Sequence, residues 1–169
     1  MKPDELAQSI ITALQAMDAH VGTAESLTGG LIAAHLTSIP GASPVVRGGV
    51  VAYSIEVKDR VLGVSSDLLT QVGAVDARVA EEMALGARAL LNADYVLATT
   101  GSAGPDPAPG GALPAIEPGE VFIAVSGPDS CVVERVQLTG SRGQIRDDAV
   151  LWALTLLEGI VTRDALNKA

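Results

Sequence analysis

Apolar side chains recur every three to four residues in several stretches of the chain, a spacing typical of helices that bury one face. In the first stretch, 6–17, Leu6, Ile10, Leu14 and Met17 share such a face after an acidic first turn. Similar spacing predicts further helices at 31–36, 55–62, 66–71, 76–92 and 144–161.

Runs of β-branched and small apolar residues lie between these expected helices. Those at 21–26, 47–54 and 95–100 each lead into a turn or helix, which predicts strands joined by crossovers. The run at 47–54 is apolar on both faces and predicts an interior strand. The runs at 120–125 and 131–138 are too close for a crossover and predict an antiparallel hairpin. We therefore expect residues 1–169 to form one α/β domain, a three-layer α/β/α sandwich with a mixed, mostly parallel sheet of about five strands.

Composition narrows the functional classes. With 48% apolar and 18% charged residues the chain is not of the disordered type, and its net charge of −9 is the wrong sign for general nucleic-acid binding. The single Cys131 cannot form an intramolecular disulfide, residues 2–18 lack a secretory leader pattern, and no stretch approaches the roughly 20 apolar residues of a membrane helix. We expect a cytoplasmic protein that binds neither nucleic acid nor membrane.

Hydroxyl residues stand at the carboxyl ends of three expected strands: Ser26, Tyr53 and Thr100. Ligands of open α/β sheets bind at this edge, so we expect the functional site there. Thr28, Gly29 and Gly30 follow Ser26 at the start of a helix, where free N–H groups favour an anion or a developing oxyanion. A capped turn without a ligand explains the segment equally well.

A nucleophilic serine needs a base, and neither histidine is well placed to serve Ser26. His20 is expected about 20 Å away along the strand, and His35 lies about 10 Å down the next helix. Lys58 is the one lysine between the terminal tails, and it follows Tyr53 by five residues. A desolvated lysine there would act as the base of a Ser-Lys pair, whereas a solvated surface lysine is the alternative.

Arg142 and Arg146 lie four residues apart at the start of the last expected helix. Their guanidinium groups are suited to a phosphate or carboxylate ligand, although an ion pair with Glu25, Asp147 or Asp148 is as simple an explanation. We expect no metal site, because there is no Cys/His cluster and the two adjacent aspartates do not share a helical face.

Four segments together resemble the CinA C-terminal domain family: Thr23-Ala-Glu-Ser-Leu-Thr-Gly-Gly30, Gly48-Gly-Val-Val-Ala-Tyr-Ser54 with Lys58, Thr100-Gly-Ser-Ala-Gly-Pro105 and Gly140-Ser-Arg-Gly-Gln-Ile-Arg146. The resemblance covers nearly the whole chain and looks like the stand-alone form of the domain. It implies a nicotinamide-nucleotide amidase, which hydrolyses nicotinamide mononucleotide to nicotinate mononucleotide and ammonia without a cofactor.

The resemblance also implies roles for individual residues. Ser26 is similar to the family's nucleophile, Lys58 to the base that activates it, and Tyr53 to a hydroxyl that assists proton transfer. Backbone N–H groups near 28–30 would hold the oxyanion. The residues expected to bind the pyridine nucleotide are Thr28, Gly29, Gly30, Thr100, Gly101, Ser102, Gly104, Arg142 and Arg146. A homo-oligomer is left open.

Several positions depart from the family's usual residues. Leu27 stands in place of Cys, Ile55 in place of Asn and Ser141 in place of Asp, and Glu117 removes a positive charge from the 106–119 loop. These departures keep two alternatives open. One is a pyridine-nucleotide-binding paralogue with impaired catalysis, and the other is an amidase for a different small amide.

Overall fold

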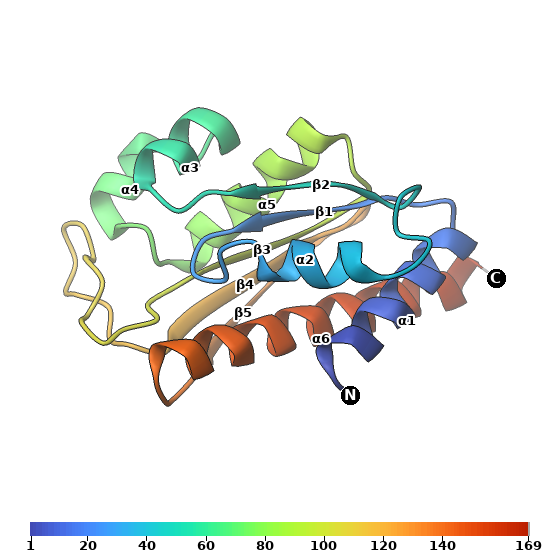
Figure 1. Ribbon diagram of the computed structural model, residues 1–169. Coiled ribbons are helices and arrows are strands. Elements are labelled where there is room, and N and C mark those ends of the chain that lie inside the picture. Colours follow the sequence, from blue (N-terminus) through green and yellow to red (C-terminus); the bar gives the residue numbers. More distant parts are fainter. Residues whose placement is uncertain (169) are drawn as a thin grey trace.

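A computed structural model describes residues 1–168, and that part of the chain alternates between helices and strands (Figure 1). The strands are β1 (Val21–Glu25), β2 (Val46–Val51), β3 (Tyr95–Gly101), β4 (Glu120–Ser126) and β5 (Cys131–Gln137). The helices are α1 (Pro3–Ala16), α2 (Leu31–Ser38), α3 (Ile55–Leu62), α4 (Ser66–Val72), α5 (Ala77–Leu91) and α6 (Arg142–Lys168). Helix α6 is longer than expected, and the Tyr95 hydroxyl anchors its last turns by donating to Asp164 at 3.0 Å.

The strands pair in the order β2-β1-β3-β4-β5. Strand β1 runs parallel to both β2 and β3, β4 is antiparallel to β3, and β5 is antiparallel to β4. The expected mixed sheet and the hairpin of β4 and β5 are therefore confirmed. Because β1, β2 and β3 are parallel, their carboxyl ends meet at one edge of the sheet.

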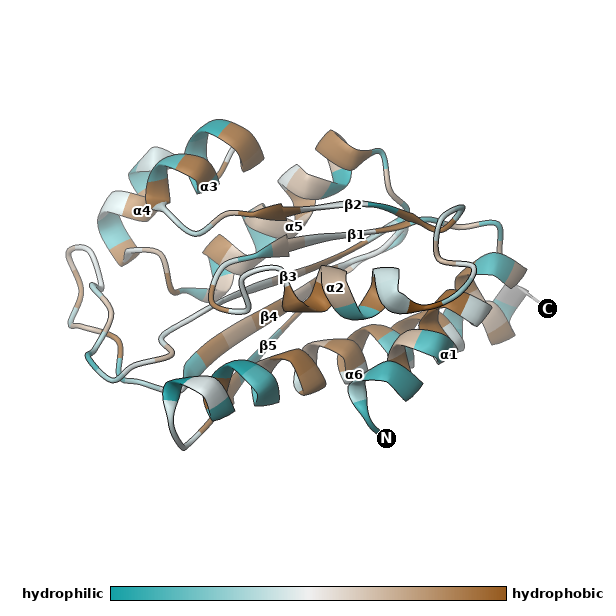
Figure 2. Cartoon of the chain, in the orientation of Figure 1, coloured by the Kyte–Doolittle hydropathy of each residue, from teal (hydrophilic) through white to brown (hydrophobic). Residues whose placement is uncertain are grey.

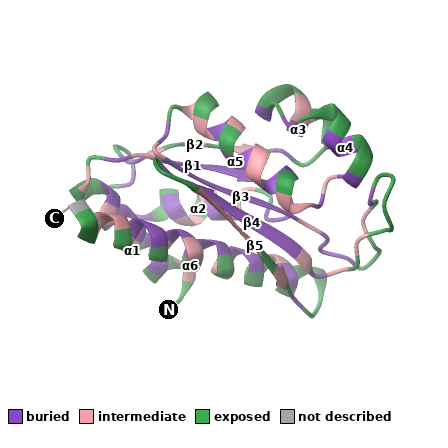
Figure 3. Ribbon diagram, turned by 180° about the vertical axis from the view of Figure 1, so that it is seen from behind, coloured by how far each residue is buried: buried purple, intermediate pink, exposed green. Residues whose placement is uncertain are grey.

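Helices cover both faces of the sheet. Helices α1, α2 and α6 pack on one face, and α3, α4 and α5 lie on the other (Figure 1). Ile10 and Leu154 belong to the apolar core of the first face, and Met83 and Val96 to that of the second. Apolar residues follow the strands, while the outer helix faces carry the polar ones (Figure 2). The three central strands β1, β3 and β4 are largely buried between these layers (Figure 3), which confirms the three-layer sandwich.

The expectation of an interior strand at 47–54 is wrong. Strand β2 lies at the edge of the sheet, pairs only with β1, and alternates between half-buried and exposed residues. Arg47, Gly49 and Val51 occupy the exposed positions. Two residues of this run are glycines, which break no apolar pattern in the sequence but have no side chain to bury. The run therefore looked more buried in the sequence than an edge strand is.

No helix among residues 1–168 is long and apolar enough to cross a membrane.

Candidate active site

Ser26 is the first residue after β1, at the edge where the parallel strands end. Its backbone N–H donates to the carbonyl of Thr99 on β3 at 3.0 Å, so the residue still follows the sheet's hydrogen-bond ladder. Its side chain is almost fully buried, with 7% of the residue exposed. The sheet therefore fixes the position of the hydroxyl, which faces a pocket.

Lys58 reaches this hydroxyl from α3, which begins directly after the turn at the end of β2. Its Nζ lies 2.9 Å from Ser26 Oγ, 2.7 Å from the Ala52 carbonyl and 3.4 Å from the Tyr53 carbonyl. The residue is completely buried, so the alternative of a solvated surface lysine is wrong. The helix begins with Ser54, whose hydroxyl accepts a hydrogen bond from the Val57 N–H and caps α3.

The surroundings of Lys58 disfavour its charged form. Burial lowers the pKa of its amine from 10.5 to about 8. Among the described residues no carboxylate forms an ion pair with it, so nothing offsets the loss of water around the charge. A substantial fraction of the amine is therefore neutral near pH 8 and able to accept a proton.

The buried Glu25 side chain caps the N-terminus of α2. Its buried carboxylate accepts hydrogen bonds from the N–H groups of Gly30 at 3.0 Å, Ile32 at 3.1 Å and Ala33 at 2.8 Å. The N–H of Gly29 donates to the Ser26 carbonyl at 3.1 Å. Gly29 and Gly30 thus have no N–H group to offer a substrate, and that part of the expectation is wrong. The sequence signal was an acidic residue just before a helix start, a position where negative charge is favourable.

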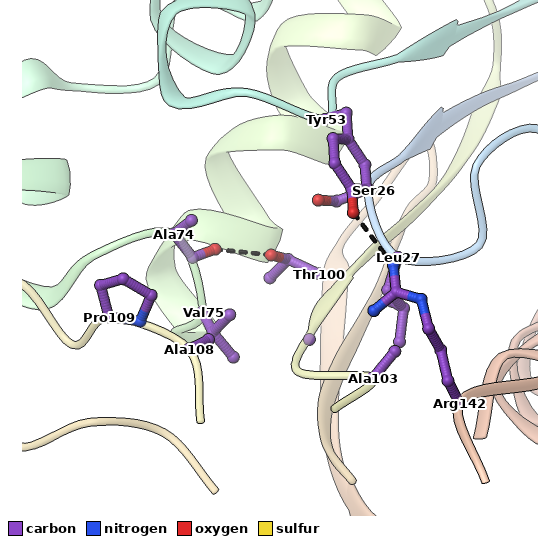
Figure 4. A pocket seen from close by; sticks show the side chains of 11 residues that line it. Ser26, Leu27, Tyr53, Ala74, Val75, Thr100, Ala103, Ala108, Pro109 and Arg142 are labelled. Carbon is purple, nitrogen blue, oxygen red and sulfur yellow. Dashed lines mark hydrogen bonds between the residues drawn. The ribbon is translucent and has the colours of Figure 1, made fainter. Parts of the chain in front are cut away.

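Tyr53 and Arg142 meet over the mouth of the site (Figure 4). Arg142 Nη2 donates to the Tyr53 hydroxyl at 3.0 Å, and Nη1 donates to the Gly104 carbonyl at 2.8 Å. Tyr53 is 61% exposed, and Arg142 is the first residue of α6. This bridge joins the loop after β2, the loop after β3 and the start of α6 around one opening.

Arg146 does not pair with Glu25, Asp147 or Asp148. Its Nε donates to the Leu27 carbonyl at 2.9 Å and its Nη2 to the Thr28 carbonyl at 3.2 Å. The proposed intramolecular ion pairs are therefore absent from the described structure for Arg146 as well as for Arg142, since both arginines donate to neutral oxygens. Of the two arginines, Arg142 lines the pocket.

The remaining expected binding residues lie after β3 or beside it. Thr100 and Gly101 line the pocket, and the Thr100 hydroxyl donates to the Ala74 carbonyl (Figure 4). Ser102 is buried, and among the described residues its hydroxyl has no partner. The Thr28 hydroxyl lies 2.8 Å from that of Thr99 inside the protein. The structure thus brings Ser26, Tyr53, Thr100, Gly101 and Arg142 together around one cavity.

The cavity has a volume of about 260 Å³. Its walls are mostly small and apolar, and several come from positions that carried no signal in the sequence: Ala74, Val75, Ala108 and Pro109. Drug-sized ligands occupy cavities of roughly 300–1,000 Å³, so this one suits a small ring or amide. The described residues contain no cluster of metal-ligating side chains.

Comparison with known proteins identifies the family. A sequence profile described as the CinA C-terminal domain matches residues 3–161. The chain belongs to the CinA C-terminal domain family. A CinA-like protein of Frankia casuarinae is 45% identical over 154 residues, which are 91% of this chain and 34% of that protein. A CinA-like protein of Synechococcus is 48% identical over 141 residues, 83% of this chain and 32% of that protein. The chain thus spans about a third of the length of these curated CinA relatives.

Solved CinA-family structures have the same fold. The competence or damage-inducible protein from Enterobacter asburiae superposes with a TM-score of 0.89 at 27% identity, covering 95% of this chain and 99% of that one. The competence/damage inducible protein CihA from Agrobacterium tumefaciens gives a TM-score of 0.85 at 37% identity, covering 92% and 93%. The α/β sandwich described above is therefore the CinA fold.

Leu27, Ile55 and Ser141 are three of the positions at which we expected a departure from the family's residues. Leu27 is buried and forms part of the pocket wall. Ile55 is 44% exposed on the first turn of α3. Ser141 precedes α6, where its N–H donates to the Gln144 side chain at 2.8 Å and its hydroxyl accepts from the Gln144 N–H at 3.4 Å. Serine caps a helix about as well as aspartate does.

Proposed function

We propose that this protein is an amidohydrolase that converts nicotinamide mononucleotide to nicotinate mononucleotide and ammonia. The observation that carries the proposal is the 2.9 Å contact between Lys58 Nζ and Ser26 Oγ, a residue that lines a small pocket. A serine hydroxyl is a weak nucleophile until a neighbouring base removes its proton. Lysine in its neutral form supplies such a base in Ser-Lys hydrolases.

The contacts of Lys58 suit the neutral amine. An NH₂ group has two N–H donors and one lone pair, and the two carbonyls of Ala52 and Tyr53 accept the two donors. The lone pair is then directed to the third contact, Ser26 Oγ, and accepts the serine proton. The lowered pKa of Lys58, about 8, keeps this form accessible near neutral pH.

The reaction then proceeds in two stages. Ser26 Oγ bonds to the carboxamide carbon while its proton passes to Lys58 Nζ, and the carbonyl oxygen becomes an oxyanion. The C–N bond breaks as the amide nitrogen takes a proton from Lys58 and leaves as ammonia. Water then attacks the resulting ester and gives a proton to Lys58. The ester C–O bond breaks as Lys58 passes this proton to Ser26 Oγ, which restores the serine hydroxyl and releases the carboxylic acid. Tyr53, whose hydroxyl oxygen accepts from Arg142, would donate a hydrogen bond to the leaving nitrogen through its O–H and so assist the proton transfer from Lys58.

The pocket suits the nicotinamide ring of a nucleotide amide in size, and its mouth suits a phosphate in charge. Its small apolar walls accommodate a flat ring, and none of its lining residues is acidic. Arg142 contributes a positive charge at the mouth, where a phosphate attached through a ribose would lie. We assign the phosphate contact to Arg142 in preference to Arg146, because Arg142 lines the pocket, whereas the guanidinium group of Arg146 donates to the carbonyls of Leu27 and Thr28.

Ammonia release tests the proposal. Purified protein is incubated with nicotinamide mononucleotide, nicotinamide riboside and nicotinamide, and ammonia and the acid product are measured together. We expect turnover of the mononucleotide, lower activity on the two smaller amides, and loss of turnover by at least about 10³-fold in Ser26→Ala. Full activity of Ser26→Ala would overturn the mechanism.

The same assay separates the two alternatives. Turnover of another small amide with none of the mononucleotide would assign a different substrate to the same Ser-Lys pair. Tight calorimetric binding of the mononucleotide with no product over hours would identify a binding paralogue. The intact contact between Ser26 and Lys58 favours the catalytic reading.

A further inference from the structure

The turn after β1 is fixed by hydrogen bonds that three of its carbonyl groups accept. The Ser26 carbonyl accepts from the Gly29 N–H, and Arg146 donates through Nε to the Leu27 carbonyl and through Nη2 to the Thr28 carbonyl. These three peptide units follow the proposed nucleophile directly. A side chain from α6, more than a hundred positions along the chain, therefore fixes the orientation of two of them.

The N–H groups of the same segment are divided into two sets. Those of Ser26 and Gly29 donate to carbonyls, and those of the first turn of α2 donate to the Glu25 carboxylate. The N–H groups of Leu27 and Thr28 are different, because neither donates a hydrogen bond within residues 1–168. Two adjacent backbone N–H donors beside a nucleophilic serine are typical of an oxyanion hole.

Peptide geometry links Arg146 to one of these donors. In a trans peptide the C=O and N–H groups point in opposite directions, so fixing one direction fixes the other. The Leu27 carbonyl and the Thr28 N–H belong to one peptide unit. When Arg146 Nε holds that carbonyl at 2.9 Å, the Thr28 N–H is directed away from α6. A charged donor on the carbonyl also polarises the peptide and strengthens its N–H as a donor.

We infer that Arg146 is a positioning residue that orients the Thr28 N–H group, beside that of Leu27, to stabilise the oxyanion formed at Ser26. The inference deepens the proposed function and rests on it. It replaces the expectation that Arg146 binds the phosphate of the substrate. Arg146 acts on the reaction through the backbone, whereas Arg142 lines the pocket itself.

Two substrates distinguish these roles. A residue that holds the phosphate matters for nicotinamide mononucleotide and not for nicotinamide riboside, whereas a residue that orients the oxyanion hole matters equally for both. In Arg146→Met we expect kcat to fall by roughly 10²-fold on each substrate, with KM within a few-fold of its original value. Arg142→Met is the matched control. We expect it to raise KM, and to do so for the mononucleotide alone.

A second measurement does not depend on the natural substrate. A fluorophosphonate reacts with an activated serine: the Ser26 oxygen bonds to phosphorus, fluoride leaves, and the serine proton passes to Lys58. The phosphoryl oxygen needs the same two N–H donors, so we expect labelling of Ser26, followed by mass spectrometry, to slow by roughly 10²-fold in Arg146→Met. Thermal unfolding of each variant checks that it folds. If the methionine variant does not fold, Arg146→Lys keeps the charge and loses the two-point hold, and it carries the same expectation.

The outcomes are distinct. Labelling of Arg146→Met or a folded Arg146→Lys at the original rate, or a loss confined to the phosphorylated substrate, overturns the inference. Slowed labelling without turnover of the mononucleotide in the unaltered protein supports the oxyanion hole and rejects the proposed substrate. Absence of labelling in the unaltered protein rejects both.

Discussion

Lys58 Nζ lies 2.9 Å from Ser26 Oγ, although the two residues are 32 positions apart and stand on different elements. Ser26 is held by the sheet, whereas Lys58 belongs to α3, an eight-residue helix that packs on α5. The contact therefore depends on how closely α3 approaches α5. That approach occurs at Gly86, where a Cβ atom would overlap the backbone of Leu62.

Gly86→Ala is expected to displace α3 and with it Lys58. The added methyl group meets the backbone of Leu62 and has no flexible side chain to push aside. We expect a loss of about 1–3 kcal/mol in the free energy of unfolding, measured in urea, and a fall in amidase activity. Gly159→Ala is the matched control: its Cβ meets nothing within 4 Å, and alanine there is expected to stabilise α6 by about 0.5–1 kcal/mol.

Activity is expected to rise with pH through the pKa of Lys58. Burial lowers this pKa to about 8, so at pH 7 roughly a tenth of the amine is neutral, and above pH 9 nearly all of it is. A plot of log(kcat/KM) against pH should climb with a slope near one and level off above about pH 8. A flat profile between pH 6 and 9 would exclude the lysine as the base.

The same shift makes stability depend on pH. The pKa is about 8 in the folded protein and 10.5 when the lysine is solvated, so the two states bind the same number of protons below pH 8 and above pH 10.5. Between these values the unfolded chain binds the extra proton, and raising the pH stabilises the folded state. Relative to Lys58→Met, stability should rise by about 3 kcal/mol from pH 8 to 10.5. An unchanged difference across this range would show that the amine is not desolvated.

Glu25→Gln tests the internal cap of α2. The carboxylate receives three backbone N–H groups, and a neutral amide offers one oxygen in their place. We expect the free energy of unfolding to fall by about 1.5–3 kcal/mol. Asp67→Asn, which changes an exposed acid on the first turn of α4, should cost less than about 1 kcal/mol. Equal losses in the two variants would mean that burial of the Glu25 carboxylate adds nothing.

Tyr53→Phe separates proton transfer from binding. The substitution keeps the ring over the pocket and removes the hydroxyl that accepts from Arg142. We expect kcat to fall by about 10²-fold while KM changes little, because the hydroxyl assists proton transfer in the transition state and does not hold the substrate. If instead KM rises with kcat unchanged, the hydroxyl serves to hold Arg142 for binding.

Periodicity predicted the layers, the hairpin and the edge at which the site lies, because crossovers and short connections leave few topologies open. It misplaced β2, since a run of Gly and Val reads as apolar whether or not a second strand flanks it. It also placed Ser26, Tyr53 and Lys58 at one edge from strand ends alone. The distance between Ser26 and Lys58 depends on tertiary packing of α3, which no local pattern encodes.

The arginines show where local patterns end. Arg142 and Arg146 are four residues apart in the sequence, and the same role in phosphate binding was predicted for both. The structure gives one to the pocket mouth and the other to the carbonyls behind Ser26. That difference depends on where α6 crosses the turn after β1, a relationship between segments far apart in the chain. The contact of Glu25 with the N-terminus of α2 is more local. The unpaired N–H groups at the start of that helix need acceptors, and this requirement would have pointed to the nearby Glu25 carboxylate.

The most direct test of the account is capture of the acylated serine. The protein is mixed with nicotinamide mononucleotide, quenched in acid within one turnover, and analysed by peptide mass spectrometry. The account predicts an ester of the nicotinate mononucleotide acyl group on Ser26, absent from Ser26→Ala and strongly reduced in Lys58→Met. Turnover that continues in Ser26→Ala, or an acyl group found on another residue, would contradict it.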